Sequence, residues 1–178
     1  MKITKKDLFT IPNLMGYFRI LMIPVFGWLY MDGQNLPAVV VLAVSEITDM
    51  LDGQVARRFH MVTDFGKMLD PVADKLTQAA VAVCLAVRYP LMWVLIGLMV
   101  IKEGYMALKG LQRIRAGKEV QGAKIYGKVC TVYLFVMMAV LVAFPQIPVR
   151  VVYALIFIAL FLMTQTLVLY MFFFRQAK

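Results

Sequence analysis

Four aspartates stand at fixed intervals in one stretch of a chain that is otherwise strongly apolar. They are Asp49, Asp52, Asp70 and Asp74. Residues three or four apart lie on the same face of a helix, so each pair projects from one helical face. Ionised side chains within apolar spanning segments are costly and usually serve binding or catalysis. We therefore expect segment 49–74 to carry the active site.

Small and basic residues accompany these acids. Gly53 and Ala56 lie beside the first pair, and Gly66 precedes the second pair. Small side chains leave room for a bulky ligand, and the guanidinium of Arg57 suits a phosphate group. Converging carboxylates repel one another unless cations neutralise them, and Mg²⁺ or Mn²⁺ prefer oxygen ligands and bridge phosphates. The pattern predicts a site for a phosphorylated or nucleotide-bearing substrate, with two metal ions suiting four acids.

The rest of the chain is typical of a protein embedded in lipid. It has 178 residues, of which 62% are hydrophobic, and a mean hydropathy of +0.80. Its apolar windows are Leu14–Met31, Leu36–Thr48, Leu76–Val87, Leu91–Ile101, Val129–Phe144 and Val151–Phe174. A spanning helix needs about 20 mostly apolar residues, and the flanks extend the shorter windows to this length. We expect an all-α integral membrane protein with six transmembrane helices. A short interfacial segment over residues 1–10 would precede them, in a single membrane-embedded domain over 1–178.

The placement of the basic residues predicts the orientation of the chain. The net charge is +9, and only Arg88 and Arg150 fall near the face opposite the motif. This asymmetry places the active site and both termini on the cytoplasmic side of a multi-pass protein in the cell (inner or plasma) membrane. The cations attract anionic lipid headgroups, and their spread over separate short connections argues against nucleic acid. The first apolar run lacks a small-residue cleavage site, so we expect no cleavable signal peptide.

The motif resembles a known family. The spacing Asp49-x2-Asp52-Gly53-x2-Ala56-Arg57-x8-Gly66-x3-Asp70-x3-Asp74 is similar, without a gap, to the signature of the CDP-alcohol phosphatidyltransferases. The resemblance implies the fold of that family, a homodimer and a role in phospholipid biosynthesis. It also implies the reaction: an acceptor hydroxyl attacks the diacylglycerol-side phosphorus of CDP-diacylglycerol, and CMP leaves.

The resemblance also implies roles for individual residues. The four aspartates would hold Mg²⁺ or Mn²⁺, and Asp74 would in addition be the general base. Gly53 and Arg57 resemble diphosphate contacts, while Ala56 and Gly66 leave room for the cytidine. Thr63 and Asn13 resemble further nucleotide contacts. The complete set expected to bind CDP-diacylglycerol is Asn13, Asp49, Asp52, Gly53, Ala56, Arg57, Thr63 and Gly66.

The amino-acid sequence around the motif resembles that of one branch of the family. Segment 69–75 (LDPVADK) and the early IPN followed by Arg19-Ile20 are similar to phosphatidylglycerophosphate synthases and the related cardiolipin synthases. The implied acceptor is sn-glycerol 3-phosphate. The glycerol-phosphate branch often carries Arg-Glu where this chain has Lys102-Glu103, so phosphatidylglycerol, serine and inositol phosphate remain open as acceptors. Cations available for an acceptor phosphate are Lys102, Arg113, Arg115, Lys124 and Lys128, although positive-inside placement explains each equally well.

Other interpretations remain beside this one. An ion or proton transporter is the alternative from a different class, because membrane acids also bind ions and relay protons. It does not account for the Gly-Ala-Arg spacing. We expect Asp64 to cap the helix that follows it, and His60 to be a solvated or headgroup-facing residue. Cys84 and Cys130 have no paired spacing and are expected to be small buried hydrophobes.

Overall fold

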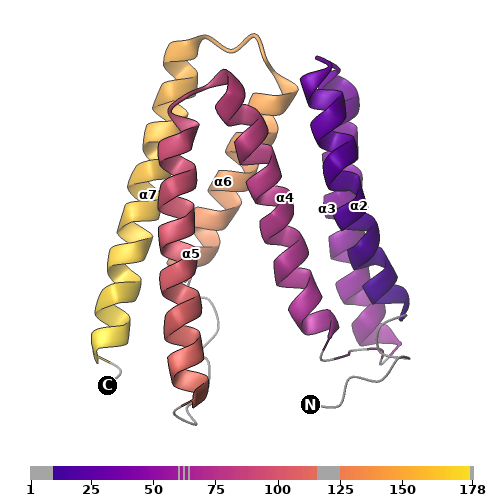
Figure 1. Ribbon diagram of the computed structural model, residues 1–178, viewed down its shortest axis with the longest axis vertical. Coiled ribbons are helices and arrows are strands. Elements are labelled where there is room, and N and C mark those ends of the chain that lie inside the picture. The colour runs from indigo at the N-terminus through magenta and orange to yellow at the C-terminus, as the bar shows by residue number, and fades with distance from the viewer. Residues whose placement is uncertain (1–9, 60, 62, 64, 116–124, 177–178) are drawn as a thin grey trace. The chain divides into compact units, whose positions relative to one another are not determined.

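The computed structural model describes residues 10–59, 61, 63, 65–115 and 125–176, with the backbone alone at 57, 67, 114, 175 and 176. These residues form six helices (Figure 1). Their bounds are α2 Ile11–Met31, α3 Asn35–Arg58, α4 Gly66–Arg88, α5 Met92–Arg115, α6 Ile125–Ala143 and α7 Val149–Gln176. The prediction of an all-α chain is confirmed. Of the expected interfacial segment over 1–10, only Thr10 belongs to the described residues.

Three of the described helices are long and apolar enough to cross a membrane: α2, α6 and α7 over Val149–Phe174. Two of them exceed the span of about 30 Å that a bilayer core requires at 1.5 Å per residue, and α6 comes close to it. The chain is therefore a membrane protein. Helices α3 and α4 carry the motif acids, and α3, α4 and α5 each carry Lys or Arg residues. These charged residues lower the mean hydropathy of the three helices. Six spans remain a prediction.

The chain divides into two compact units, and the motif lies in the first. This unit comprises α2, α3 and α4 as far as Cys84, with Val142–Pro145. Helices α2 and α3 run side by side (Figure 1), joined by a short turn in which Gly33 has φ +78°. That left-handed conformation favours glycine. Where α2 meets α4, a Cβ on Gly16 would come within 2.8 Å of Leu69 Cδ2, so the missing side chain permits close helix packing.

The second unit contains α5, α7 and α6 as far as Leu141, and side chains of α6 and α7 are in contact within it. Tyr170 of α7 packs against Tyr126 of α6 with ring centroids 4.9 Å apart. The hydroxyl of Tyr133 donates a hydrogen bond to the Leu155 carbonyl at 3.0 Å. Cys130 is buried in this unit, as predicted, whereas Cys84 is only partly buried. A single domain over 1–178 remains a prediction.

Candidate active site

The start of α4 is held by a small polar cluster made of residues from α2 and from the connection after α3. Thr63 Oγ1 accepts a hydrogen bond from the Gly66 N–H at 3.0 Å and another from Asn13 Nδ2 at 3.2 Å. Asn13 is almost fully buried, and a Cβ on Gly66 would lie 2.6 Å from its Oδ1. Thr63 therefore caps α4. The expected cap, Asp64, and His60 both lie outside the described residues.

Removing the Thr63 hydroxyl tests this cap. We expect Thr63→Ala to destabilise the protein by about 1 kcal/mol, the usual cost of losing a side-chain cap. Asn13 Nδ2 would also lose its hydrogen bond to Thr63 Oγ1. Thr63→Ser keeps the hydroxyl and should unfold at the wild-type temperature. Thermal unfolding in detergent measures both variants, and equal melting temperatures for Thr63→Ala and Thr63→Ser would contradict the capping role.

The four motif aspartates converge on one cation, Arg19 of α2. Arg19 Nη1 is hydrogen-bonded to Asp49 Oδ1 and to Asp74 Oδ1, the latter at 2.6 Å. Arg19 Nη2 lies 3.3 Å from Asp52 Oδ2 and 3.6 Å from Asp70 Oδ1. Each end of the guanidinium thus bridges an acid of α3 and an acid of α4. The convergence that the spacing predicted is present in the first unit.

These charges differ in their access to solvent. The side chains of Arg19 and Asp52 are each 3% exposed, whereas those of Asp49, Asp70 and Asp74 are 36%, 45% and 56% exposed. Asp52 Oδ2 and two Arg19 nitrogens, Nε and Nη2, are buried without a hydrogen-bond partner in the structure. The cluster therefore has a closed floor, formed by Arg19 and Asp52, and an open side formed by the other three acids.

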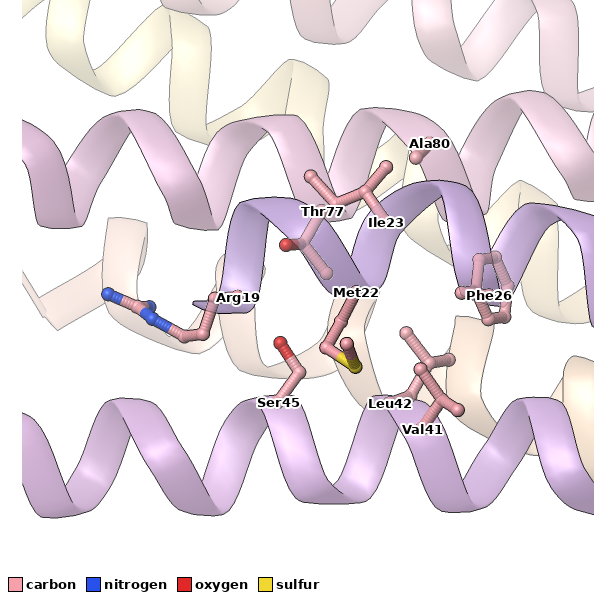
Figure 2. A pocket seen from close by; sticks show the side chains of 9 residues that line it. All are labelled: Arg19, Met22, Ile23, Phe26, Val41, Leu42, Ser45, Thr77 and Ala80. Carbon is pink, nitrogen blue, oxygen red and sulfur yellow. The ribbon is translucent and has the colours of Figure 1, made fainter. Parts of the chain in front are cut away.

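An apolar pocket lies beside Arg19. It is lined by residues of α2, α3 and α4: Arg19, Met22, Ile23, Phe26, Val41, Leu42, Ser45, Thr77 and Ala80. Figure 2 shows Arg19 at one end of this pocket, with its guanidinium extending away from the apolar side chains. Thr77 is satisfied within its own helix, because its hydroxyl donates to the Ala73 carbonyl at 3.0 Å. The Arg19 side chain is 3% exposed, and burial weakens screening by solvent, so its ion pairs are stronger here than in water.

The donor set fits a hard divalent cation. Four carboxylates gather around the guanidinium of Arg19, and Asp52 Oδ2 is buried without a hydrogen-bond partner among the described residues. Among the described residues, no three His, Cys, Asp or Glu side chains are grouped tightly enough to hold a metal ion. A planar guanidinium is wider than a point ion, and Mg²⁺ binds oxygen at about 2.0–2.1 Å. Carboxylates gathered around Arg19 consequently stand farther apart than metal ligands do.

The other predicted site residues have different surroundings. Gly53 and Ala56 are half-buried on α3 beyond Asp52, and the Arg57 side chain lies outside the described part of the chain. The expected acceptor cations on α5 and α6 belong to the second unit. They are Lys102, buried and paired with Glu103 at 3.0 Å, Arg113, stacked 5.9 Å from the Phe174 ring, and the exposed Arg115 and Lys128. Lys124 is not among the described residues.

Sequence reasoning missed the role of Arg19. Arg19 was noted only as part of the Arg19-Ile20 pair that resembles one branch of the family. The sequence nevertheless contained a signal for its role. Arg19 is the one charged residue within the apolar helix α2, Ile11–Met31. An ionised side chain inside a spanning segment indicates a nearby partner of opposite charge, and the aspartates supply it.

Comparison with known proteins identifies the class of protein. The family model of the CDP-alcohol phosphatidyltransferases matches residues 9–174. This match covers both compact units and the complete motif. The chain therefore belongs to the CDP-alcohol phosphatidyltransferase family, and the resemblance seen in the motif is confirmed.

Individual relatives carry two kinds of name. A Bacillus subtilis protein named CDP-diacylglycerol--glycerol-3-phosphate 3-phosphatidyltransferase is 34% identical over 142 residues, covering 70% of this chain and 72% of the relative. A Pseudomonas fluorescens protein of the same name is 43% identical, covering 47% and 44%. A Schizosaccharomyces pombe cardiolipin synthase (CMP-forming) / mitochondrial hydrolase fusion protein is 36% identical, covering 47% and 14%. The matched stretch thus spans less than half of the second and third relatives.

Proposed function

We propose that the chain transfers the phosphatidyl group of CDP-diacylglycerol to sn-glycerol 3-phosphate, giving phosphatidylglycerophosphate and CMP in phospholipid biosynthesis. Family membership and the names of the Bacillus and Pseudomonas relatives support this reaction. The observation that carries it is the convergence of Asp49, Asp52, Asp70 and Asp74 from two helices. Such a set of carboxylates suits chemistry on a diphosphate.

The four aspartates would hold Mg²⁺ or Mn²⁺, with two ions suiting the number of acids. The metals would supply positive charge to the diphosphate as the phosphoanhydride bond breaks. Gly53 and Arg57 would contact the diphosphate, and Ala56 and Gly66 would leave room for the cytidine. Thr63 Oγ1 accepts hydrogen bonds from Asn13 Nδ2 and from the Gly66 N–H of α4, and these bonds favour a supporting role for Asn13 and Thr63. They would shape the nucleotide site by holding the start of α4.

Asp74 would act as the general base. Its side chain is the most exposed of the four, at 56%, so an acceptor hydroxyl can approach it. In the proposed step the hydroxyl oxygen forms a bond to the diacylglycerol-side phosphorus, and Asp74 takes the hydroxyl proton. The phosphoanhydride bond breaks, and its electron pair leaves on the phosphate of CMP. Arg19 keeps the Asp74 carboxylate oriented through the 2.6 Å hydrogen bond.

The reaction would take place at the cytoplasmic face of a membrane. All six helices would span the membrane, with the motif and both termini on the cytoplasmic side, as the distribution of Lys and Arg favours. The enzyme would work as a homodimer in the cell membrane.

The acceptor phosphate would bind among the cations at the ends of α5 and α6. Arg113 is a candidate, because its Nη1 is buried without a hydrogen-bond partner in the described part of the chain.

Release of CMP tests the reaction. The purified chain is reconstituted with CDP-diacylglycerol and Mg²⁺ or Mn²⁺, and sn-glycerol 3-phosphate, phosphatidylglycerol, serine and inositol phosphate are offered separately. We expect metal-dependent CMP release with glycerol 3-phosphate and none after chelation by EDTA. If no acceptor gives CMP release, phosphatidyltransferase activity of this chain is excluded.

The same assay separates the alternatives. Cardiolipin synthesis from phosphatidylglycerol is the second candidate, because the Schizosaccharomyces relative and a Drosophila melanogaster relative carry cardiolipin synthase names. Release with phosphatidylglycerol alone would assign the chain to that branch. An ion or proton transporter predicts flux in sealed vesicles and no CMP.

A further inference from the structure

The guanidinium of Arg19 occupies the centre of the four carboxylates. Its Nη1 joins Asp49 to Asp74, and its Nη2 faces Asp52 and Asp70. Both pairs combine one residue of α3 with one of α4. A single side chain from α2 therefore ties together the two helices that carry the motif.

Arg19 is also confined to this position. Its side chain is 3% exposed, and apolar residues of α2 and α3 line the pocket behind it (Figure 2). An arginine stays charged at any ordinary pH. Moving this charge away from its partners into apolar surroundings would be strongly unfavourable. Arg19 must therefore remain beside the acids, whether or not another cation is present.

We propose that Arg19 is a positioning residue that acts as a built-in counter-cation of the carboxylate site. It holds the four acids together when no metal is bound, and it competes with divalent metal for Asp49 and Asp74. This inference rests on the proposed function only in taking the four aspartates as metal ligands. The solvent-exposed acids Asp49, Asp70 and Asp74 form the side from which metal enters, while Arg19 and Asp52 stay in place as the floor.

The charges explain both effects. Arg19 pairs with Asp49, Asp52, Asp70 and Asp74, and replacing it with a neutral residue removes its positive charge from among the four carboxylates. Repulsion among them then grows in the metal-free protein, which loses stability. A divalent ion, in contrast, meets a more negative site and no competing cation, so it binds more tightly. A residue with a merely structural role would lower stability without raising metal affinity.

Mn²⁺ binding to the detergent-solubilised full chain, measured without substrates by electron paramagnetic resonance, tests the inference. We expect Arg19→Gln to bind Mn²⁺ about ten-fold more tightly than wild type, or better. Its melting temperature should fall in EDTA and recover in saturating Mn²⁺. Arg19→Lys keeps the charge but replaces two bridging nitrogens with one ammonium. We expect its Mn²⁺ affinity to lie between those of the wild type and Arg19→Gln.

Two control variants test whether the effect of Arg19→Gln depends on the position of Arg19, and not on loss of any positive charge or on loss of stability alone. Arg150→Gln removes an exposed positive charge from α7 and should leave Mn²⁺ affinity unchanged. Val81→Ala trims a buried apolar side chain of the first unit that does not line the pocket beside Arg19, so it should lower the melting temperature equally with and without metal.

Unchanged or weaker Mn²⁺ binding in Arg19→Gln would overturn the inference, even if wild type binds Mn²⁺ and releases CMP. If Arg19→Gln cannot be purified, Arg19→Lys provides the test. A Mn²⁺ affinity of Arg19→Lys equal to or below that of wild type would overturn the inference. Failure of the proposed function has a different signature, because wild type would then bind Mn²⁺ without releasing CMP.

Discussion

Replacing Asp74 by Asn should lower turnover by about 10³-fold or more, since general-base catalysis alone contributes roughly 10²–10⁴-fold. Asparagine has the size of aspartate but cannot take the hydroxyl proton. Its amide oxygen can still accept the hydrogen bond that Arg19 donates to Asp74, so the local structure should persist. Binding of CDP-diacylglycerol should therefore stay close to that of wild type. Initial rates of CMP release and equilibrium binding of the nucleotide measure the two properties separately.

Asp32→Asn is the matched control for this variant. Asp32 lies in the turn between α2 and α3, where Gln34 Nε2 donates a hydrogen bond to it at 2.6 Å. The same chemical change there should leave turnover unaltered. Wild-type turnover in Asp74→Asn would refute the general-base assignment. Loss of nucleotide binding together with turnover would instead assign Asp74 to the binding of substrate.

Asp52→Asn is expected to have the next largest effect. Asp52 is the buried acid of the cluster, at 3% exposure, and its Oδ2 has no hydrogen-bond partner within the described ranges of the chain. Neutralising it removes a carboxylate that solvent cannot replace. We expect Mn²⁺ affinity to fall by about 100-fold, at the upper end of the effect of changing a residue that supports a metal ligand. Turnover should fall with it and recover in part at high metal concentration.

Titration of CMP release against Mg²⁺ distinguishes this result from general damage. A ligand role raises the metal concentration needed for half-maximal rate, whereas misfolding lowers the maximal rate at every concentration. Ser45→Ala, a buried polar position on the same helix, should leave the metal requirement near that of wild type. An unchanged metal requirement in Asp52→Asn would remove Asp52 from the proposed ligand set.

The helices were largely predictable because their pattern is local. The apolar window Val151–Phe174 comes within two residues of both ends of α7, Val149–Gln176. The windows Leu36–Thr48 and Leu76–Val87 cover only the apolar parts of α3 and α4, because the motif continues both helices. The window Leu91–Ile101 was less accurate at its end, because α5 continues to Arg115. Contacts within the second unit explain the difference. Lys109 lies 5.8 Å from the Tyr105 ring, and Arg113 lies 5.9 Å from the Phe174 ring of α7.

Asn13 shows a second limit of local reasoning. Its place in the chain resembles a nucleotide contact, yet its side chain is buried and bonded to Thr63, fifty positions away. The partner of a buried amide depends on which helices pack together, and a linear pattern does not contain that information. Gly66 reflects the same packing, because a Cβ there would collide with Asn13.

The amino-acid sequence by itself determined the family, the helical class and the four acids, because helical spacing alone places Asp49 with Asp52 and Asp70 with Asp74 on shared faces. Only the tertiary structure decided how these acids differ. The side chain of Asp52 is 3% exposed and that of Asp74 is 56% exposed. Helix packing brings Arg19, thirty residues from Asp49, between the two pairs. Burial and ion pairing across helices depend on distances in space, and these arise only when α2, α3 and α4 pack.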